Sequence, residues 1–265
     1  MAFHCKKALL IALLLALSGQ VHALDVGHAS KIGELFNQAG VSGTFVLYDL
    51  NDDLLLIHNP SRAEKRFIPA STFKIPNSLI GLSTGAVGNE YEIIPYGGKP
   101  QPIKSWEQDM GLSDAIKISN VPVYQELARR IGLEVMRSSL VTVGYGNMET
   151  GSEVDAFWLK GPLKISAVEQ VKFLTRLVTD DLPFPIDVQQ TVRDMVKLDQ
   201  KADRVLYGKT GWTTAPDPDI GWWVGWVTSD NGVYIFALNI DIETKADVAQ
   251  RVKLGKACLL ALGIF

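Results

Sequence analysis

Histidine and cysteine are scarce in this chain, which has four His and two Cys among 265 residues. His4 and His22 fall in an N-terminal stretch that we expect to be removed, so only His28 and His58 remain. So few nitrogen and sulfur ligands argue against a zinc site, and they supply a Ser-His-Asp triad poorly. Any serine nucleophile in this protein would therefore need a base other than histidine.

A hydrophobic run long enough to span a membrane is also missing. The most apolar stretch, Ala8–Leu17, has about half of the roughly 20 residues that a spanning helix needs. Two lysines precede it, and Val21-His22-Ala23 follows as a small-residue cleavage site of the kind found in export signals. We expect residues 1–23 to be a cleaved signal, with an uncleaved anchor as the less favoured alternative. Residues 24–265 would then form one catalytic domain in the periplasm, with secretion left open.

Charge of one sign is not in excess, since 26 basic and 29 acidic residues give a net charge of −3. Such a mild deficit gives no reason to expect nucleic acid or an anionic membrane as a partner. Once the signal is removed, Cys258 is the one remaining thiol, so no internal disulfide is expected. Cys258 lies in an apolar stretch of the sequence, so we expect it to be buried in the core.

The order of predicted elements indicates an α+β fold. Strand patterns occur near both ends of the sequence and helix patterns in the middle. They predict an antiparallel sheet flanked by helices, plus a mainly helical lobe, with a cleft between the two as the natural site. The expected elements are a helix within 24–42, strands at 43–50 and 54–58, helices from Ser71 and at 110–118, 122–130, 166–178 and 188–198, strands at 204–208, 221–228 and 233–241, and a helix at 247–262.

Ser71 and Lys74 are the first candidates for chemistry. In a helix, residues three apart share a face, so the two side chains would touch near the positive end of the helix dipole. Lys74 would be the base that a serine hydroxyl needs to become a nucleophile. Pro76 fits only if it falls near the first turn of that helix, and a kink is the alternative. The pair alone is a weak signal, because any helix start can carry it.

Three more polar clusters follow along the chain: Ser119-Asn120-Val121, Tyr145-Gly146-Asn147 and Lys209-Thr210-Gly211. Each has an ordinary structural explanation when taken alone. The first would be a helix cap ahead of Pro122, the second a turn, and the third a polar end of the strand at 204–208. The third could also offer a fixed positive charge, a hydroxyl donor and room for a ligand beside a strand edge.

The four clusters together, in this order, resemble those of the active-site serine penicillin-recognising enzymes, and most closely the class D β-lactamases (oxacillinases). The resemblance covers nearly all of residues 24–265 and extends to Phe157-Trp158-Leu159 and Gly221–Trp226. A class A enzyme would carry Ser-Asp-Asn at the second cluster. Class C enzymes are longer and carry Tyr-Ala/Ser-Asn, and the related sensor domains are tethered by membrane segments.

The resemblance implies that Ser71 attacks a β-lactam carbonyl to form an acyl-enzyme, with the oxyanion held by the backbone N–H groups of Ser71 and Trp212. It implies that CO₂ converts Lys74 to N6-carboxylysine, which serves as the general base. That reaction needs a neutral amine, and hence an apolar site that lowers the pKa of Lys74. Phe73, Val121, Phe157 and Leu159 could supply its walls. Trp158 would donate its indole N–H to the carbamate.

The remaining roles also follow from the resemblance. Ser119 would pass a proton to the leaving nitrogen, Lys209 would lie beside Ser119, and Thr210 and Arg251 would hold the substrate carboxylate. No metal and no cofactor other than CO₂ is implied, and a dimer is compatible with the family. The loop Trp212–Asp219 is expected to shape the substrate range. The other residues expected to line the substrate site are Trp106, Val121, Tyr145, Asn147, Leu159, Gly211 and Trp212.

Three alternatives to a β-lactamase are also compatible with the sequence. A D,D-peptidase would use the same serine but would stay acylated by a β-lactam. A non-enzymatic sensor domain would also hold the acyl group. The third is an exported α+β domain in which the four clusters occur by coincidence.

Overall fold

The computed structural model describes residues 23–214 and 218–265. The predicted signal segment lies outside the described residues except for Ala23, where the first helix begins. Residues 215–217, within the predicted specificity loop Trp212–Asp219, also lie outside them. In the part of the chain that is described, no helix is long and apolar enough to cross a membrane.

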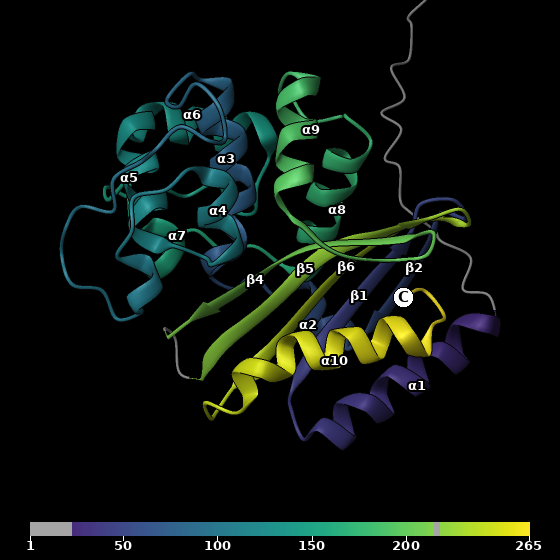
Figure 1. Ribbon diagram of the computed structural model, residues 1–265. Coiled ribbons are helices and arrows are strands. Elements are labelled where there is room, and N and C mark those ends of the chain that lie inside the picture. The colour runs from purple at the N-terminus through teal and green to yellow at the C-terminus, as the bar shows by residue number, and fades with distance from the viewer. Residues whose placement is uncertain (1–22, 215–217) are drawn as a thin grey trace, which may run out of the picture.

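A six-stranded antiparallel sheet forms the centre of the molecule (Figure 1). Its spatial order is β2-β1-β6-β5-β4-β3, so strands from both ends of the sequence pair in one sheet, as predicted. The strands expected at 43–50 and 54–58 are present as the antiparallel hairpin of β1 and β2. The strands are β1 (Gly43–Asp49), β2 (Leu54–His58), β3 (Lys197–Lys201), β4 (Arg204–Thr213), β5 (Asp219–Ser229) and β6 (Gly232–Ile242).

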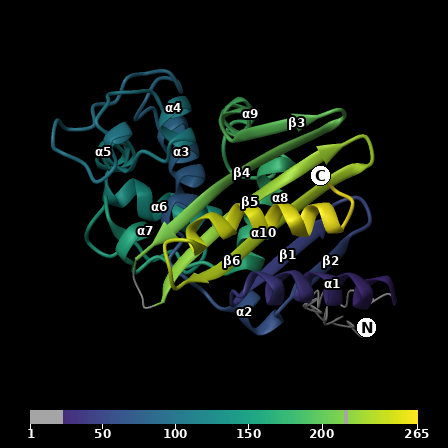
Figure 2. The ribbon, with the colours of Figure 1, turned by 60° about the horizontal axis from the view of Figure 1, so that its bottom comes forward.

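Both faces of the sheet are covered by helices. Alternate residues of β5 point to opposite faces and so enter two different cores. Trp222 and Trp226 belong to the core shared with the helical lobe, whereas Trp223 packs into a second core. The second core lies under α1 (Ala23–Ala39) and α10 (Asp247–Ala261), which cross one face side by side (Figure 2). Cys258 is fully buried there, as predicted.

The opposite face of the sheet carries the helical lobe, as the sequence predicted (Figure 1). The capping box at Ser166 and Glu169 is formed and opens α8, which packs directly on the sheet. The lobe and its links comprise α2 (Pro60–Glu64), the 3₁₀ turn η1 (Ala70–Phe73), α3 (Lys74–Ser83), η2 (Lys104–Trp106), α4 (Leu112–Lys117), α5 (Val121–Ile131), α6 (Leu133–Val143), α7 (Phe157–Lys160), α8 (Ala167–Val178) and α9 (Ile186–Met195).

Several predicted boundaries are wrong. The helix expected at 188–198 is α9, which begins at Ile186 and ends at Met195, since pairing with β4 draws the next residues into β3. Asp187 is a possible cap for this helix from its sequence, but Pro185 is the N-cap, and the Asp187 carboxylate accepts from the N–H of Val188 within the first turn. Helices α6 and α7 are absent from the predicted elements, and α7 contains the apolar residues 157–159.

Candidate active site

Ser71 lies in the 3₁₀ turn η1, directly before α3 begins at Lys74. Pro76 is the third residue of α3, so it falls in the first turn, where its missing N–H has no helical partner to lose. This agrees with the predicted placement of Pro76. Ala70 has a positive φ of 49°, a strained value for a residue with a Cβ, immediately before the serine.

The side chains of Ser71 and Lys74 are in contact, as the spacing predicted. Lys74 Nζ lies 2.9 Å from Ser71 Oγ, and Lys74 is only 1% exposed. Burial holds the pKa of Lys74 well below its usual value, and the positive charge of Lys209 lowers it further. This lowered pKa favours the neutral form of the amine, which lies beside a hydroxyl as a base would need to.

Aromatic rings surround this pair. The Phe73 ring stacks on Trp158 with centroids 5.3 Å apart and meets Phe157 edge-on at 5.1 Å. On the other side, Lys74 Nζ lies 5.2 Å from the centre of the Tyr124 ring. Phe73, Trp158 and Tyr124 are all fully buried. The Tyr124 ring lies against the amine itself, and the burial of Lys74 is the main cause of its lowered pKa.

A second contact joins the lobe to the sheet. Lys209 Nζ, from β4, lies 3.0 Å from Ser119 Oγ, from the loop before α5. Ser119 has a φ of 58°, and its neighbour Asn120, rather than Ser119, caps α5 by accepting from the N–H of Val123. Burial, followed by the charge of Arg251, lowers the pKa of Lys209 to about 7. A small change in this site can thus shift Lys209 between its charged and neutral forms near neutral pH.

The edge of β4 packs closely against the turn that carries Ser71. A Cβ at Gly211 would lie 2.9 Å from the carbonyl oxygen of Pro69, so only glycine allows this approach. Two hydrogen bonds fix the same junction: Trp222 Nε1 donates to the Ile68 carbonyl at 2.9 Å, and Thr213 Oγ1 donates to the Leu159 carbonyl at 3.0 Å. Ser71 and the backbone of β4 are therefore held together by rigid elements.

Arg251, on α10, reaches the same end of β4. Its guanidinium donates to the carbonyl of Gly211, and its Nε donates to that of Val248 at 2.6 Å. Its stem lies over Gly221, where a Cβ would come within 2.8 Å of the Arg251 Cδ. Burial lowers the pKa of Arg251 to about 10. Lys209 points toward the helical lobe, where it meets Ser119. Successive residues of a strand point to opposite faces, so Thr210 points to the other face of β4, which α10 and Arg251 cover.

The other predicted lining residues divide into two groups. Trp212 is 41% exposed, with its indole N–H donating to Asp219 at 3.0 Å, and Trp106 donates to the Ile118 carbonyl beside Ser119. Val121 and Leu159 are half-buried. Tyr145, by contrast, is buried against Phe73, and Asn147 holds its own loop to residues 162–164. The contacts of these last two are structural.

Residues outside the four sequence clusters also form hydrogen bonds that hold the turn carrying Ser71 and the first turns of α3. Thr72 Oγ1 donates to the Pro69 carbonyl at 2.7 Å and accepts from Gln170 Nε2 at 2.9 Å. Ser78 shares a hydrogen bond of 2.8 Å with the Tyr124 hydroxyl and donates to the Lys74 carbonyl. Nothing in the sequence marks Gln170 or Tyr124, since each lies within a helix whose amphipathic pattern explains its presence.

The chemistry available here is nucleophilic attack by a serine with a lysine base and a second serine-lysine pair nearby. Within residues 23–214 and 218–265, no three His, Cys, Asp or Glu side chains come together as a metal site would require. A separate cavity lies beside Lys209 at the edge of β4, away from Ser71, and is described below.

Comparison with known proteins agrees with these features. A family model described as the penicillin-binding protein transpeptidase domain matches residues 43–259. The chain is 39% identical over 232 residues to "Beta-lactamase OXA-5" of Pseudomonas aeruginosa, covering 86% of this chain and 87% of that protein. It is 40% identical over 224 residues to "Beta-lactamase OXA-48" of Klebsiella pneumoniae, covering 84% of each.

Solved structures agree with the sequence comparisons. The structure of FUS-1 (OXA-85), a class D β-lactamase from Fusobacterium nucleatum subsp. polymorphum, superposes with a TM-score of 0.87 and is 44% identical, covering 89% of this chain and 98% of that one. The class D β-lactamase YbXI from Nostoc also gives a TM-score of 0.87, at 41% identity, covering 88% of this chain and 99% of that one.

Proposed function

The chain belongs to the class D β-lactamases, and on that premise we propose that it hydrolyses β-lactam antibiotics through an acyl-enzyme on Ser71. One observation carries the proposal: the buried amine of Lys74, whose pKa is lowered by that burial, lies 2.9 Å from the Ser71 hydroxyl. The pair has both a nucleophile and the base that activates it, with no histidine needed.

The base is proposed to be carboxylated Lys74. A neutral amine takes up CO₂ and releases a proton, which leaves an anionic carbamate where an ammonium would otherwise be. The apolar walls around Lys74 support this chemistry, because they suppress the charged ammonium that cannot react. Trp158, buried on the Phe73 ring, is proposed to donate its indole N–H to the carbamate. The carbamate would then supply an anionic proton acceptor for Ser71.

Acylation and deacylation follow from the same groups. Ser71 Oγ loses its proton to the base and bonds to the β-lactam carbonyl carbon, while the backbone N–H groups of Ser71 and Trp212 stabilise the oxyanion. The carbon–nitrogen bond then breaks, and the proton taken up by the base is relayed through Ser119 to the nitrogen, with Lys209 3.0 Å from Ser119 as its partner. The freed base then takes a proton from a water that attacks the ester carbonyl, and it returns that proton to Ser71 Oγ as the acyl group leaves.

Thr210 and Arg251 are proposed to bind the carboxylate that penicillins and cephalosporins carry. Both side chains lie on one face at the end of β4, and the guanidinium is already fixed by the carbonyls of Gly211 and Val248. A preorganised arginine binds a carboxylate with two parallel hydrogen bonds at little entropic cost. We further propose that residues 1–23 direct export to the periplasm and that residues 24–265 are a single catalytic domain.

Hydrolysis of nitrocefin, measured with and without bicarbonate, tests the proposal. We expect steady turnover that falls in CO₂-depleted or acidic buffer and recovers when bicarbonate is added. A single burst without turnover would indicate a D,D-peptidase or a sensor domain instead. Steady turnover that ignores bicarbonate would contradict the carboxylated base while leaving the hydrolase assignment intact.

A further inference from the structure

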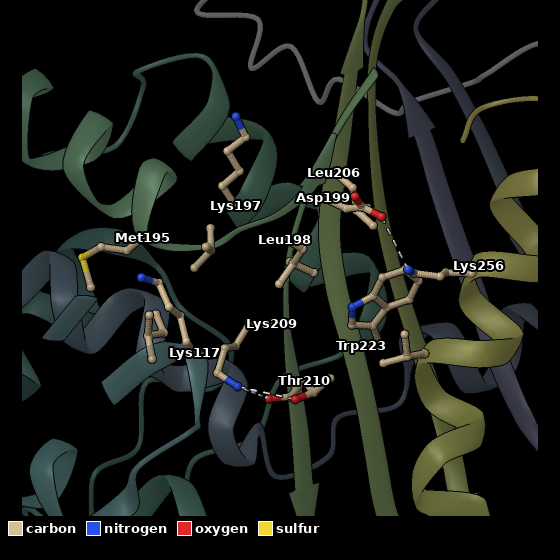
Figure 3. Close-up of a pocket in the computed structure, with 14 residues that line it drawn as sticks. Lys117, Met195, Lys197, Leu198, Asp199, Leu206, Lys209, Thr210, Trp223 and Lys256 are labelled. Atoms are coloured by element: carbon tan, nitrogen blue, oxygen red, sulfur yellow. Dashed lines mark hydrogen bonds and ion pairs between the residues drawn. The ribbon is translucent and has the colours of Figure 1, made fainter. Parts of the chain in front are cut away.

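A cavity of about 490 Å³ lies at the edge of the sheet, beyond the end of β3 (Figure 3). Residues of β3, β4, α4 and α10 line it, and its inner end is formed by Lys209 and Thr210. None of the substrate contacts proposed above requires the rest of this cavity. Its volume is within the range of roughly 300–1,000 Å³ that small-molecule sites in proteins occupy.

Gly208 lies in the wall of the cavity, where the absence of a side chain lets Trp223 and Leu198 pack closely on β4. A Cβ there would lie 2.9 Å from the Val224 carbonyl oxygen, 3.2 Å from Trp223 Nε1 and 3.3 Å from Leu198 Cδ1. The Leu198 side chain lies on the edge strand β3 and is 51% exposed. Access from the cavity to the Trp223 indole therefore depends on the Leu198 side chain rather than on the backbone of the sheet.

Trp223 gives this cavity a polar feature that packing does not explain. The residue is fully buried, yet its indole N–H has no hydrogen-bond partner among the described residues. Figure 3 shows the indole nitrogen turned toward Leu198, on the cavity side of the ring. A buried donor without an acceptor destabilises the folded state, so an acceptor in the cavity would be stabilising.

The charge around the cavity identifies the kind of acceptor. Lys117, Lys197, Lys209 and Lys256 line it with one acid, Asp199, although the whole chain carries a net charge of −3. The rim lysines make weak contacts: Lys256 lies 4.0 Å from Asp199, Lys117 lies 3.6 Å from Asp114, and Lys197 donates to Gln200. Long flexible lysines with such partners can turn toward an anion.

We propose that this cavity is a binding site for an organic anion with one carboxylate on an apolar body. A carboxylate oxygen accepts the hydrogen bond of the Trp223 indole, and the lysines at the rim compensate its charge. The apolar body packs against Leu206 and Val252, on the face of β4 that α10 covers. The site adjoins the proposed active site at Lys209 and Thr210, but binding there needs no turnover to be detected.

Titration of the ¹⁵N-labelled protein with 4-phenylbutyrate, followed at the tryptophan indole resonances, tests the proposal. Trp223→Phe assigns the Trp223 resonance by its disappearance. We expect that resonance to shift with 4-phenylbutyrate in a saturable manner and to stay in place with the uncharged 4-phenylbutan-1-ol. An unmoved resonance up to millimolar 4-phenylbutyrate would mean that the cavity holds only water, and equal shifts with both compounds would refute a carboxylate site.

Two pairs of variants locate the binding. Lys197→Gln/Lys256→Gln should raise the Kd of 4-phenylbutyrate roughly tenfold, since each exposed ion pair changes an equilibrium by up to about fivefold. The control Lys245→Gln/Lys253→Gln makes the same charge change at exposed positions that do not line the cavity and should have a much smaller effect. Arg251→Ala should leave the Kd unchanged. An equal effect of both lysine pairs, or a Kd that depends on Arg251, would overturn the assignment.

Discussion

Replacing Lys74 by methionine should make the protein more stable while removing its activity. Lys74 is 1% exposed, and burial holds its pKa well below the usual value, so the folded state carries the cost of a buried amine. Methionine has similar length and suits the aromatic walls formed by Phe73 and Tyr124. The substitution removes the base for Ser71 but leaves no buried charge behind.

The expected magnitudes follow from the geometry. Removing a buried polar group that is not fully hydrogen-bonded recovers about 1–3 kcal/mol, and the broken hydrogen bond to Ser71 Oγ brings the gain toward the lower end. In a domain of this size, each kcal/mol shifts Tm by roughly 2–4 °C. Loss of the general base should reduce kcat/KM for nitrocefin by at least about 10²- to 10⁴-fold.

The pH dependence of this gain has a definite sign. The pKa of Lys74 is lowered in the folded state, whereas a lysine of the unfolded chain titrates near pH 10.4. Between the two pKa values the unfolded state binds more protons, so the wild-type free energy of unfolding rises with pH. The advantage of Lys74→Met should therefore be largest at low pH and should shrink, as the pH approaches about 10.4, to the part that comes from burial of a neutral amine.

Thermal unfolding in CO₂-depleted buffer, from acidic to alkaline pH, measures the effect. Lys253→Met, at an exposed position of α10, is the matched control and should change Tm little at any pH. Added bicarbonate should stabilise the wild type and leave Lys74→Met unaffected, because only the wild type can bind CO₂ as a carbamate. A lower Tm for Lys74→Met, or a gain that does not shrink with rising pH, would refute the reasoning.

Two further substitutions test individual roles. Trp158→Phe keeps a buried ring on Phe73 but removes the indole N–H, so pre-steady-state kinetics should show slower deacylation with acylation less affected; equal slowing of both steps would reject a role in holding the carbamate. Arg251→Ala should lower kcat/KM for benzylpenicillin by about 10- to 150-fold, the value of a charge-assisted hydrogen bond, and should spare the penicillin methyl ester. Equal losses on acid and ester would instead indicate that Arg251 acts only through Gly211.

Local sequence patterns predicted the contacts that depend on short spacings. Ser71 and Lys74 touch because one helical turn separates them, and β1 and β2 pair because a turn of three polar residues joins them. The pairing of Lys209 with Ser119 spans 90 residues, and no periodicity could supply it. It was expected from the family resemblance alone.

The incorrect secondary-structure predictions fall where tertiary contacts determine whether a segment forms a helix or a strand. Residues 186–201 contain no glycine or proline, so no local sequence signal separates α9 from β3. Pairing with β4 sets the boundary between them. Helix α6 lies between Gly132 and Gly144 and ends in β-branched residues, a composition that also suits a strand. Its buried Met136, Leu140 and Val143 show that packing on the lobe determines the helix.

The supporting residues of the site were unpredictable for a similar reason. Gln170 reaches Thr72 across 98 residues of sequence, and Tyr124 reaches Ser78 across 46. Each also lies at a buried position of an amphipathic helix, so the pattern indicates core and nothing more. A polar side chain in a core becomes informative only when its partner is known.

The central claim is that Ser71 forms a covalent acyl-enzyme, and intact-mass spectrometry of the protein mixed with benzylpenicillin tests it most directly. In CO₂-depleted acidic buffer, where deacylation is expected to be slow, the wild type should gain the full mass of the antibiotic, and peptide mapping should place the addition on Ser71. Ser71→Ala should gain none. An adduct that persists in Ser71→Ala, or one that maps to another residue such as Ser119, would contradict the account.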